Sequence, residues 1–379
     1  MLNNAKNFPP YDYLESTTFY LFSVVALLVA QFFVGVVLSV LLPFIPDLAE
    51  NGDFNAVAMI FFQAVNVLLI YLFSRIKKRR FNFDIYVNRD TGRGVTVKTI
   101  LLPIAAAVVL MAGMYLPTVW YGYLTEAMGI PPEAGAIQID TVSALVLLIF
   151  ASVVLAPVFE ETIYRGILLH GLRDENSAVK AALLSALAFM LMHLSPLQTI
   201  YQFALGFLSA MIALKTKRLL PSIILHASSN ALALIVEVTP FITTVGYCVD
   251  WLVARPLAAT FITLGLFAAA FGILFVIVKW GLTEKKMDGY VKPVESKAGE
   301  PIVVFEELRE QVKPQEKIVV FEELREQEEK EEASINVANE SVEEMRKKLR
   351  KKDGTVRFYI GIGICVLMLI VNTVTLIIS

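Results

Sequence analysis

Residues 159–165 read Phe-Glu-Glu-Thr-Ile-Tyr-Arg, and they directly follow residues 142–158, which contain no charged side chain. The charges come well before any loop signal, so both parts are expected in one long helix. Charged side chains inside a membrane helix are costly and usually mark a function. Glu161 and Arg165 are four residues apart and share a helix face, where they can form an ion pair. Glu160 lies about 100° around the helix from Glu161, so it points elsewhere and stays available for chemistry.

The composition places this helix in a membrane protein. Of the 379 residues, 56% are hydrophobic and only 18% are charged. Several continuous apolar runs reach the roughly 20 residues that a membrane-spanning helix needs, and their continuity disfavours a β-barrel. We therefore predict an all-α polytopic membrane protein. The net charge of -2 and the lack of a basic face give no indication of a nucleic-acid partner.

Eight apolar runs form the predicted core, and a ninth run ends the chain. They are residues 18–43, 54–74, 100–116, 142–173, 178–194, 197–214, 221–236, 257–278 and 358–378. We expect the first run to be retained as a helix rather than removed as a signal. The fourth run would be about 48 Å long as a straight helix, so it must tilt, kink or project from the bilayer. Basic loops follow spans two, four, six and eight, which predicts a cytoplasmic N-terminus.

Residues 281–357 differ from the rest because they are polar and dense in charge. We therefore predict three parts: a transmembrane bundle (1–280), a charged cytoplasmic linker (281–357) and a C-terminal transmembrane helix (358–379). Within the linker, residues 302–311 and 318–327 both read Ile-Val-Val-Phe-Glu-Glu-Leu-Arg-Glu-Gln. Charge-rich tracts are commonly solvated linkers. The repeated apolar side chains leave open a cytoplasmic partner for this segment.

Further polar residues lie inside other apolar runs. His193 ends the fifth run, and His226 and Asn230 lie four residues apart on one face of the seventh. Polar groups in lipid must face the bundle interior and find one another, so we expect these three residues and Glu160 to share one site. Gln63 and Asn66 in the second run are interpreted as hydrogen-bonding contacts between helices rather than as site residues.

Three motifs in successive apolar runs resemble the CPBP family, which comprises CAAX-type intramembrane proteases and bacteriocin-processing or immunity proteins. They are Glu-Glu-x-x-x-Arg (Glu160, Glu161, Arg165), Phe-x-x-x-His (Phe189, His193) and His-x-x-x-Asn (His226, Asn230). The resemblance is close over residues 142–236 and looser over the eight-helix core. The charged segment and the ninth run lie outside it.

The resemblance implies hydrolysis of a peptide bond within the membrane by a glutamate-activated water. Glu160 would be the general base, and His193 would hold or polarise the water. His226 and Asn230 would stabilise the oxyanion. Arg165 would be structural through Glu161, with a role for Glu161 as a second catalytic acid left open. The expected substrate is a small secreted or membrane peptide at a bacterial plasma membrane, and no cofactor is expected.

Three alternatives remain open from the sequence. A zinc protease could use the same glutamate and histidines, although the helical His-Glu-x-x-His signature is missing from the sequence. A transporter or proton relay also uses intramembrane Glu and His, but the chain shows no inverted repeat. A non-catalytic scaffold or immunity protein would act through the repeat-bearing segment.

Overall fold

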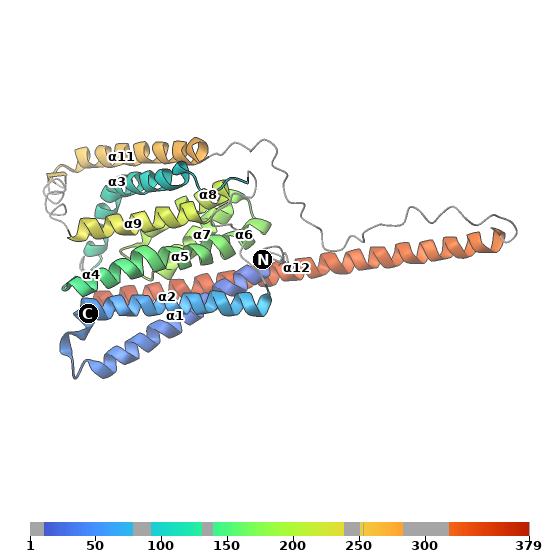
Figure 1. Cartoon of the computed structure of the whole chain (residues 1–379), viewed down its shortest axis with the longest axis horizontal. Coiled ribbons are helices and arrows are strands. Elements are labelled where there is room, and N and C mark those ends of the chain that lie inside the picture. The colour runs from blue at the N-terminus through green and yellow to red at the C-terminus, as the bar shows by residue number, and fades with distance from the viewer. Residues whose placement is uncertain are drawn as a thin grey trace. The chain divides into compact units, whose positions relative to one another are not determined.

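The computed structural model describes residues 11–78, 92–130, 139–238, 251–252, 254–282 and 318–378. Within these ranges the chain is helical and forms no β-strand, which confirms the predicted all-α fold (Figure 1). The first copy of the ten-residue repeat, 302–311, lies outside the described residues. The second copy begins the helix α12 (Ile318–Ile378).

Eight of the described helices are long and apolar enough to cross a membrane, which confirms a multi-pass membrane protein. They are α1 (Tyr13–Leu41), α2 (Gly52–Lys77), α3 (Val97–Ala127), the continuous run Val142–Glu175, α8 (Thr199–Thr216), α9 (Leu220–Val238), α11 (Pro256–Val276) with the π-helical turn η4 (Ile277–Gly281), and Glu343–Thr375 of α12. The remaining apolar helix, α7 (Ala178–Met192), has 15 residues. It spans only about 22 Å, less than the bilayer core. The fifth predicted span is therefore shorter than expected, because its helix ends at Met192.

Side-chain caps fix the start of the helices that carry the motifs. Thr141 accepts a hydrogen bond from the backbone N–H of Ala144 (2.9 Å), and Ser177 accepts one from the N–H of Lys180 (3.3 Å). These hydroxyls satisfy backbone donors that the first helical turn leaves unpaired. The caps therefore set where the fourth and fifth apolar runs begin.

The run from Val142 to Glu175 is one continuous helix that widens twice. It comprises α4 (Val142–Leu148), the π-helical η2 (Ile149–Leu155), α5 (Ala156–Glu161), the π-helical η3 (Thr162–Leu168) and α6 (Leu169–Glu175). Such π-helical turns are rare and occur frequently at functional sites. The Glu-Glu pair thus ends a short α-helical stretch between two wide turns.

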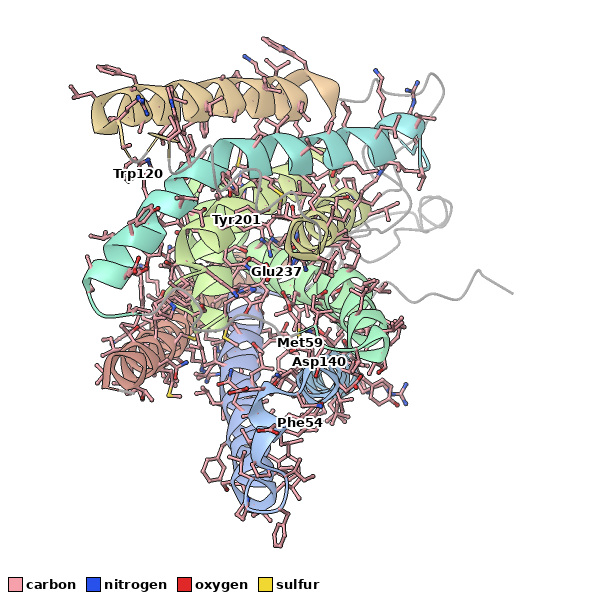
Figure 2. The ribbon with its side chains drawn as sticks, turned by 90° about the vertical axis from the view of Figure 1, so that its left-hand side faces the viewer. Phe54, Met59, Trp120, Asp140, Tyr201 and Glu237 are labelled. Atoms are coloured by element: carbon pink, nitrogen blue, oxygen red, sulfur yellow. The ribbon has the colours of Figure 1, made fainter. Side chains whose placement is uncertain are left out.

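By its internal contacts the chain divides into two units, one formed by Met1–Tyr290 with Gly354–Ser379 and the other by Val291–Asp353. In the first unit α11 packs on α3, α3 packs on α9, and α9 packs on α5, as Figure 1 shows. Figure 2 shows α11 lying along α3, where the Nε1–H of Trp120 donates to the hydroxyl of Thr263 (3.2 Å). The predicted domain boundaries remain a prediction.

Candidate active site

Glu161 is a buried carboxylate with two basic partners. Its side chain and that of Arg165 are both 0% exposed, and the Arg165 Nε lies 3.2 Å from Glu161 Oε2. The expected ion pair between them therefore forms. The Nδ1 of His226 lies 3.0 Å from Glu161 Oε1, and Arg165 Nη2 also donates to the carbonyl of Gly206 (2.8 Å). A charge buried in this way is tolerated because it is paired and hydrogen-bonded.

Phe189, from the second motif, lies between the charged pair and the two imidazoles. The guanidinium carbon of Arg165 is 4.5 Å from the centre of the Phe189 ring, a cation–π arrangement. The ring also makes edge contacts with His193 and His226, with centroid distances of 4.8 Å and 5.5 Å. Gly206 leaves room for this ring, because an added Cβ would lie 3.1 Å from Phe189 Cδ1. Phe189 therefore sets the spacing of both histidines.

Glu160 points away from Glu161, as helix geometry predicts, but it is not unpartnered. The amide of Gln63 in α2 donates to Glu160 Oε1 (3.1 Å), and the amide of Asn66 donates to Gln63 Oε1 (3.0 Å). The other carboxylate oxygen lies 4.0 Å from His226 Nε2. Gln63 and Asn66 do connect helices, as expected, yet the connection is made at the site itself. Two amides almost one helical turn apart in an apolar run were the signal that could have included them.

A cavity of about 140 Å³ lies in front of Glu160. A water molecule needs roughly 10–15 Å³ of such volume, so the cavity can hold several. Its wall is made by Ser23, Leu27, Gln31, Met59, Phe62, Gln63, Asn66, Glu160, Ile163, Tyr164, Met192 and His193. The Glu160 side chain is 18% exposed, whereas that of Glu161 is fully buried. Of the two carboxylates, Glu160 is therefore the one that can reach water.

His193 presents an unprotonated nitrogen at this site. Its Nδ1 lies 2.9 Å from the carbonyl oxygen of Phe189. Because a carbonyl only accepts hydrogen bonds, Nδ1 carries the proton, and in the neutral ring Nε2 is left with a lone pair. His193 can therefore accept a hydrogen bond from a water molecule in the cavity.

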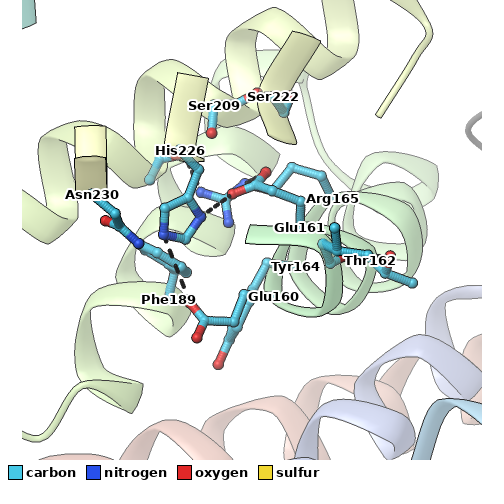
Figure 3. A network of polar contacts seen from close by, with 12 residues as sticks. Glu160, Glu161, Thr162, Tyr164, Arg165, Phe189, Ser209, Ser222, His226 and Asn230 are labelled. Atoms are coloured by element: carbon cyan, nitrogen blue, oxygen red, sulfur yellow. Dashed lines mark hydrogen bonds and ion pairs between the residues drawn. The ribbon is translucent and has the colours of Figure 1, made fainter. Parts of the chain in front are cut away.

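His226 lies between the two glutamates, as Figure 3 shows, with Nδ1 facing Glu161 and Nε2 facing Glu160. Glu161, held by Arg165, accepts the hydrogen bond from Nδ1–H. In the neutral ring Nε2 then carries a lone pair, and it becomes a donor only when His226 is doubly protonated. The imidazole thus connects the buried carboxylate to the accessible one.

Asn230 lies one turn beyond His226 on α9, and its amide donates to the backbone carbonyl of Ser152 (2.7 Å). In η2 the N–H groups bond five residues back, as Ala156 does to Ala151. The carbonyl of Ser152 would pair in this pattern with residue 157, which is a proline and has no N–H. Asn230 therefore supplies the donor that Pro157 lacks.

The structure thus brings four of the expected site residues, together with Arg165, into one connected cluster. Glu160, Glu161 and His226 are joined by polar contacts, and His193 shares the cavity wall with Glu160. Asn230 is bonded to the backbone of η2, and the cavity wall includes neither it nor His226. In the described part of the chain, no group of three or more His, Cys, Asp or Glu side chains is arranged to hold a metal ion.

Comparison with known proteins agrees with the motifs. Residues 142–232 match the family model of the type II CAAX prenyl endopeptidase Rce1-like proteins. The chain is also 27% identical over 118 residues to a Bacillus subtilis (strain 168) protein named "Putative membrane peptidase YdiL", which covers 31% of this chain and 48% of the relative. The matched part therefore spans about half the length of that relative. No solved structure matches the chain.

Proposed function

We propose that this chain, a CPBP-family membrane protein by its three motifs and its family match, is an intramembrane endopeptidase. Its substrate would be a membrane-associated peptide or protein. The observation that carries the proposal is the position of Glu160. It is a partly exposed carboxylate on the wall of a cavity large enough for water, inside a helical bundle and beside two histidines.

In the proposed reaction Glu160 is the general base. It removes a proton from a water molecule in the cavity, and the water oxygen attacks the carbonyl carbon of the substrate. His193 accepts the second hydrogen of that water through Nε2 and so orients it. When the C–N bond of the tetrahedral intermediate breaks, Glu160 returns its proton to the leaving nitrogen. General acid–base catalysis of this kind contributes about 10²- to 10⁴-fold to the rate.

The oxyanion donors that the resemblance implies are His226 and Asn230. His226 can serve only in its doubly protonated form, because Nδ1 already donates to Glu161. Asn230 has a second amide hydrogen besides the one it gives to Ser152. For this role, the substrate carbonyl oxygen would have to lie about 2.7–3.1 Å from these nitrogen atoms. Glu161 and Arg165 would hold His226 in place, which is a positioning role.

The remaining features of the proposal follow from charge and composition. Arg75 and Lys77 end α2, and Lys215 lies in the last turn of α8. These clusters support a cytoplasmic location for the basic loops and the N-terminus, in a bacterial plasma membrane. We propose that hydrolysis needs no metal ion and that the substrate is a small secreted or membrane peptide. A cytoplasmic partner for the repeat-bearing segment remains a separate prediction.

The test compares the membrane peptides of cells that carry the native protein, Glu160→Gln or Glu237→Gln. Glu237 is an exposed glutamate of α9, so its substitution is a matched control for the same chemical change. We expect cleavage products with the native protein and with Glu237→Gln, and none with Glu160→Gln. Identical peptide profiles in all three strains would contradict the proposal. The scaffold alternative predicts instead that Glu160→Gln keeps the cellular function and that deletion of residues 291–353 removes it.

A further inference from the structure

The last apolar helix, outside the segment that matches the family, packs on the bundle through a regular stripe. The members of the stripe are spaced alternately by four and three residues, as in coiled-coil packing. They are Gly354, Phe358, Gly361, Cys365, Met368 and Asn372 of α12, the first four buried and the last two partly buried. A Cβ at either glycine would lie 2.7 Å from a ring carbon of α1, that of Tyr13 or Tyr20. The stripe therefore fixes α12 closely against α1.

The same face of α12 touches α7 on both sides of His193. The thiol of Cys365 lies 3.4 Å from the sulfur of Met192. The amide of Asn372 donates to the carbonyl oxygen of Leu194 (3.0 Å). Met192 and His193 both line the cavity that contains Glu160. Asn372 therefore holds the turn that carries His193 without reaching the cavity itself.

This turn needs support from outside. His193 is the C-terminal cap of α7, and Leu194 follows it with a φ of 49°. Helices often end with a residue in this left-handed conformation, but it is usually glycine, because a side chain costs roughly 1–2 kcal/mol there. Leu194 keeps the conformation with its side chain 6% exposed and its carbonyl bonded to Asn372. The contact with α12 thus stabilises a backbone shape that the local sequence disfavours.

We propose that Asn372 is a positioning residue for His193, and that the C-terminal helix is therefore part of the catalytic apparatus of this chain. The proposal rests on the function proposed above. Without the Asn372 amide, the turn relaxes and the Nε2 of His193 moves relative to Glu160. Small displacements of a catalytic group of this kind can lower the rate by about 100-fold.

The experiment uses the full-length protein in lipid nanodiscs and three variants. Asn372→Leu removes the amide at nearly constant volume. Thr373→Val is the matched control, because its hydroxyl bonds only within α12, to the carbonyl of Leu369 (2.7 Å). We expect Asn372→Leu to lower kcat about 10- to 100-fold with KM unchanged, and Thr373→Val to behave like the native protein. Adding Leu194→Gly to Asn372→Leu should restore part of kcat, because glycine adopts the left-handed turn without strain.

Amide hydrogen exchange at residues 190–195 provides a readout that does not depend on activity. Asn372→Leu should speed exchange there and leave α8 unchanged, which separates a local change from general unfolding. A kcat within twofold of native, or unchanged exchange at residues 190–195, would overturn the positioning role. If the native protein and Glu160→Gln are equally inactive, the proposed function fails. The exchange comparison then still decides whether Asn372 holds the turn.

Discussion

Glu160→Gln and Glu161→Gln are the same chemical change at neighbouring positions, and the structure predicts opposite consequences for stability. Glu161 is fully buried and is the anionic partner of Arg165, which is itself fully buried. Removing one partner of a buried ion pair costs about 3–5 kcal/mol, because the other charge is left uncompensated. Glutamine keeps one oxygen that can accept from Arg165 or His226, so we expect Glu161→Gln to cost about 3 kcal/mol.

Glu160→Gln should cost much less. The side chain is partly exposed to the cavity, and the amide oxygen of the new glutamine can still accept from Gln63. We therefore expect a loss below about 1 kcal/mol, as for substitutions that bury no new charge. The free energy of unfolding is measured by titrating each purified variant from mild detergent into SDS and following helicity. This assay needs no substrate, so it is independent of the proposed activity.

Two results would refute this view of the pair. One is a Glu161→Gln protein as stable as the native protein, and the other is an equal loss for both variants. Joint replacement of both ion-pair partners by Glu161→Leu and Arg165→Met provides a further check. The double variant should be more stable than Glu161→Leu alone, because it removes the buried charge that the single change leaves behind.

Three other predictions follow from the site. Asn230→Leu should lower the free energy of unfolding by about 1–3 kcal/mol, because the Ser152 carbonyl loses its donor, and Pro157→Ala should reduce this loss by restoring an N–H; additive losses in a double-mutant cycle would contradict the link. Gly206→Ala should destabilise the protein and lower activity, because its Cβ would press on Phe189 and Ala186 at 3.1–3.2 Å. Gly122→Ala, which meets no atom within 4 Å, should be neutral or stabilising in the same unfolding titration. Treatment with EDTA should leave peptide hydrolysis by the purified protein unchanged, whereas a loss restored by stoichiometric zinc would support the metal alternative.

The sequence predicts this site best where one helix carries the relation. The pairing of Glu161 with Arg165 and the different direction of Glu160 follow from 3.6 residues per turn, and the structure agrees with both. The grouping of His193 and His226 with the glutamates follows from the cost of polar side chains in lipid. These relations need no knowledge of how the helices are packed.

The remaining contacts depend on tertiary register, which the sequence does not contain. The bond between Gln63 and Glu160 joins residues of α2 and α5, 97 positions apart, and the bond between Asn372 and Leu194 joins residues 178 apart. The role of Asn230 at Ser152 depends on η2 being π-helical, whereas regular helix spacing was assumed. The early end of α7 was likewise hidden, because the apolar run continues beyond Met192.

The most direct test of a water-activating Glu160 is the cleavage rate of purified protein in lipid vesicles, with a peptide identified from the cellular comparison as substrate. The Glu160→Gln protein should unfold at nearly the same SDS fraction as the native protein and cleave the peptide about 10²- to 10⁴-fold more slowly. A folded Glu160→Gln protein that cleaves at the native rate would contradict the proposed mechanism.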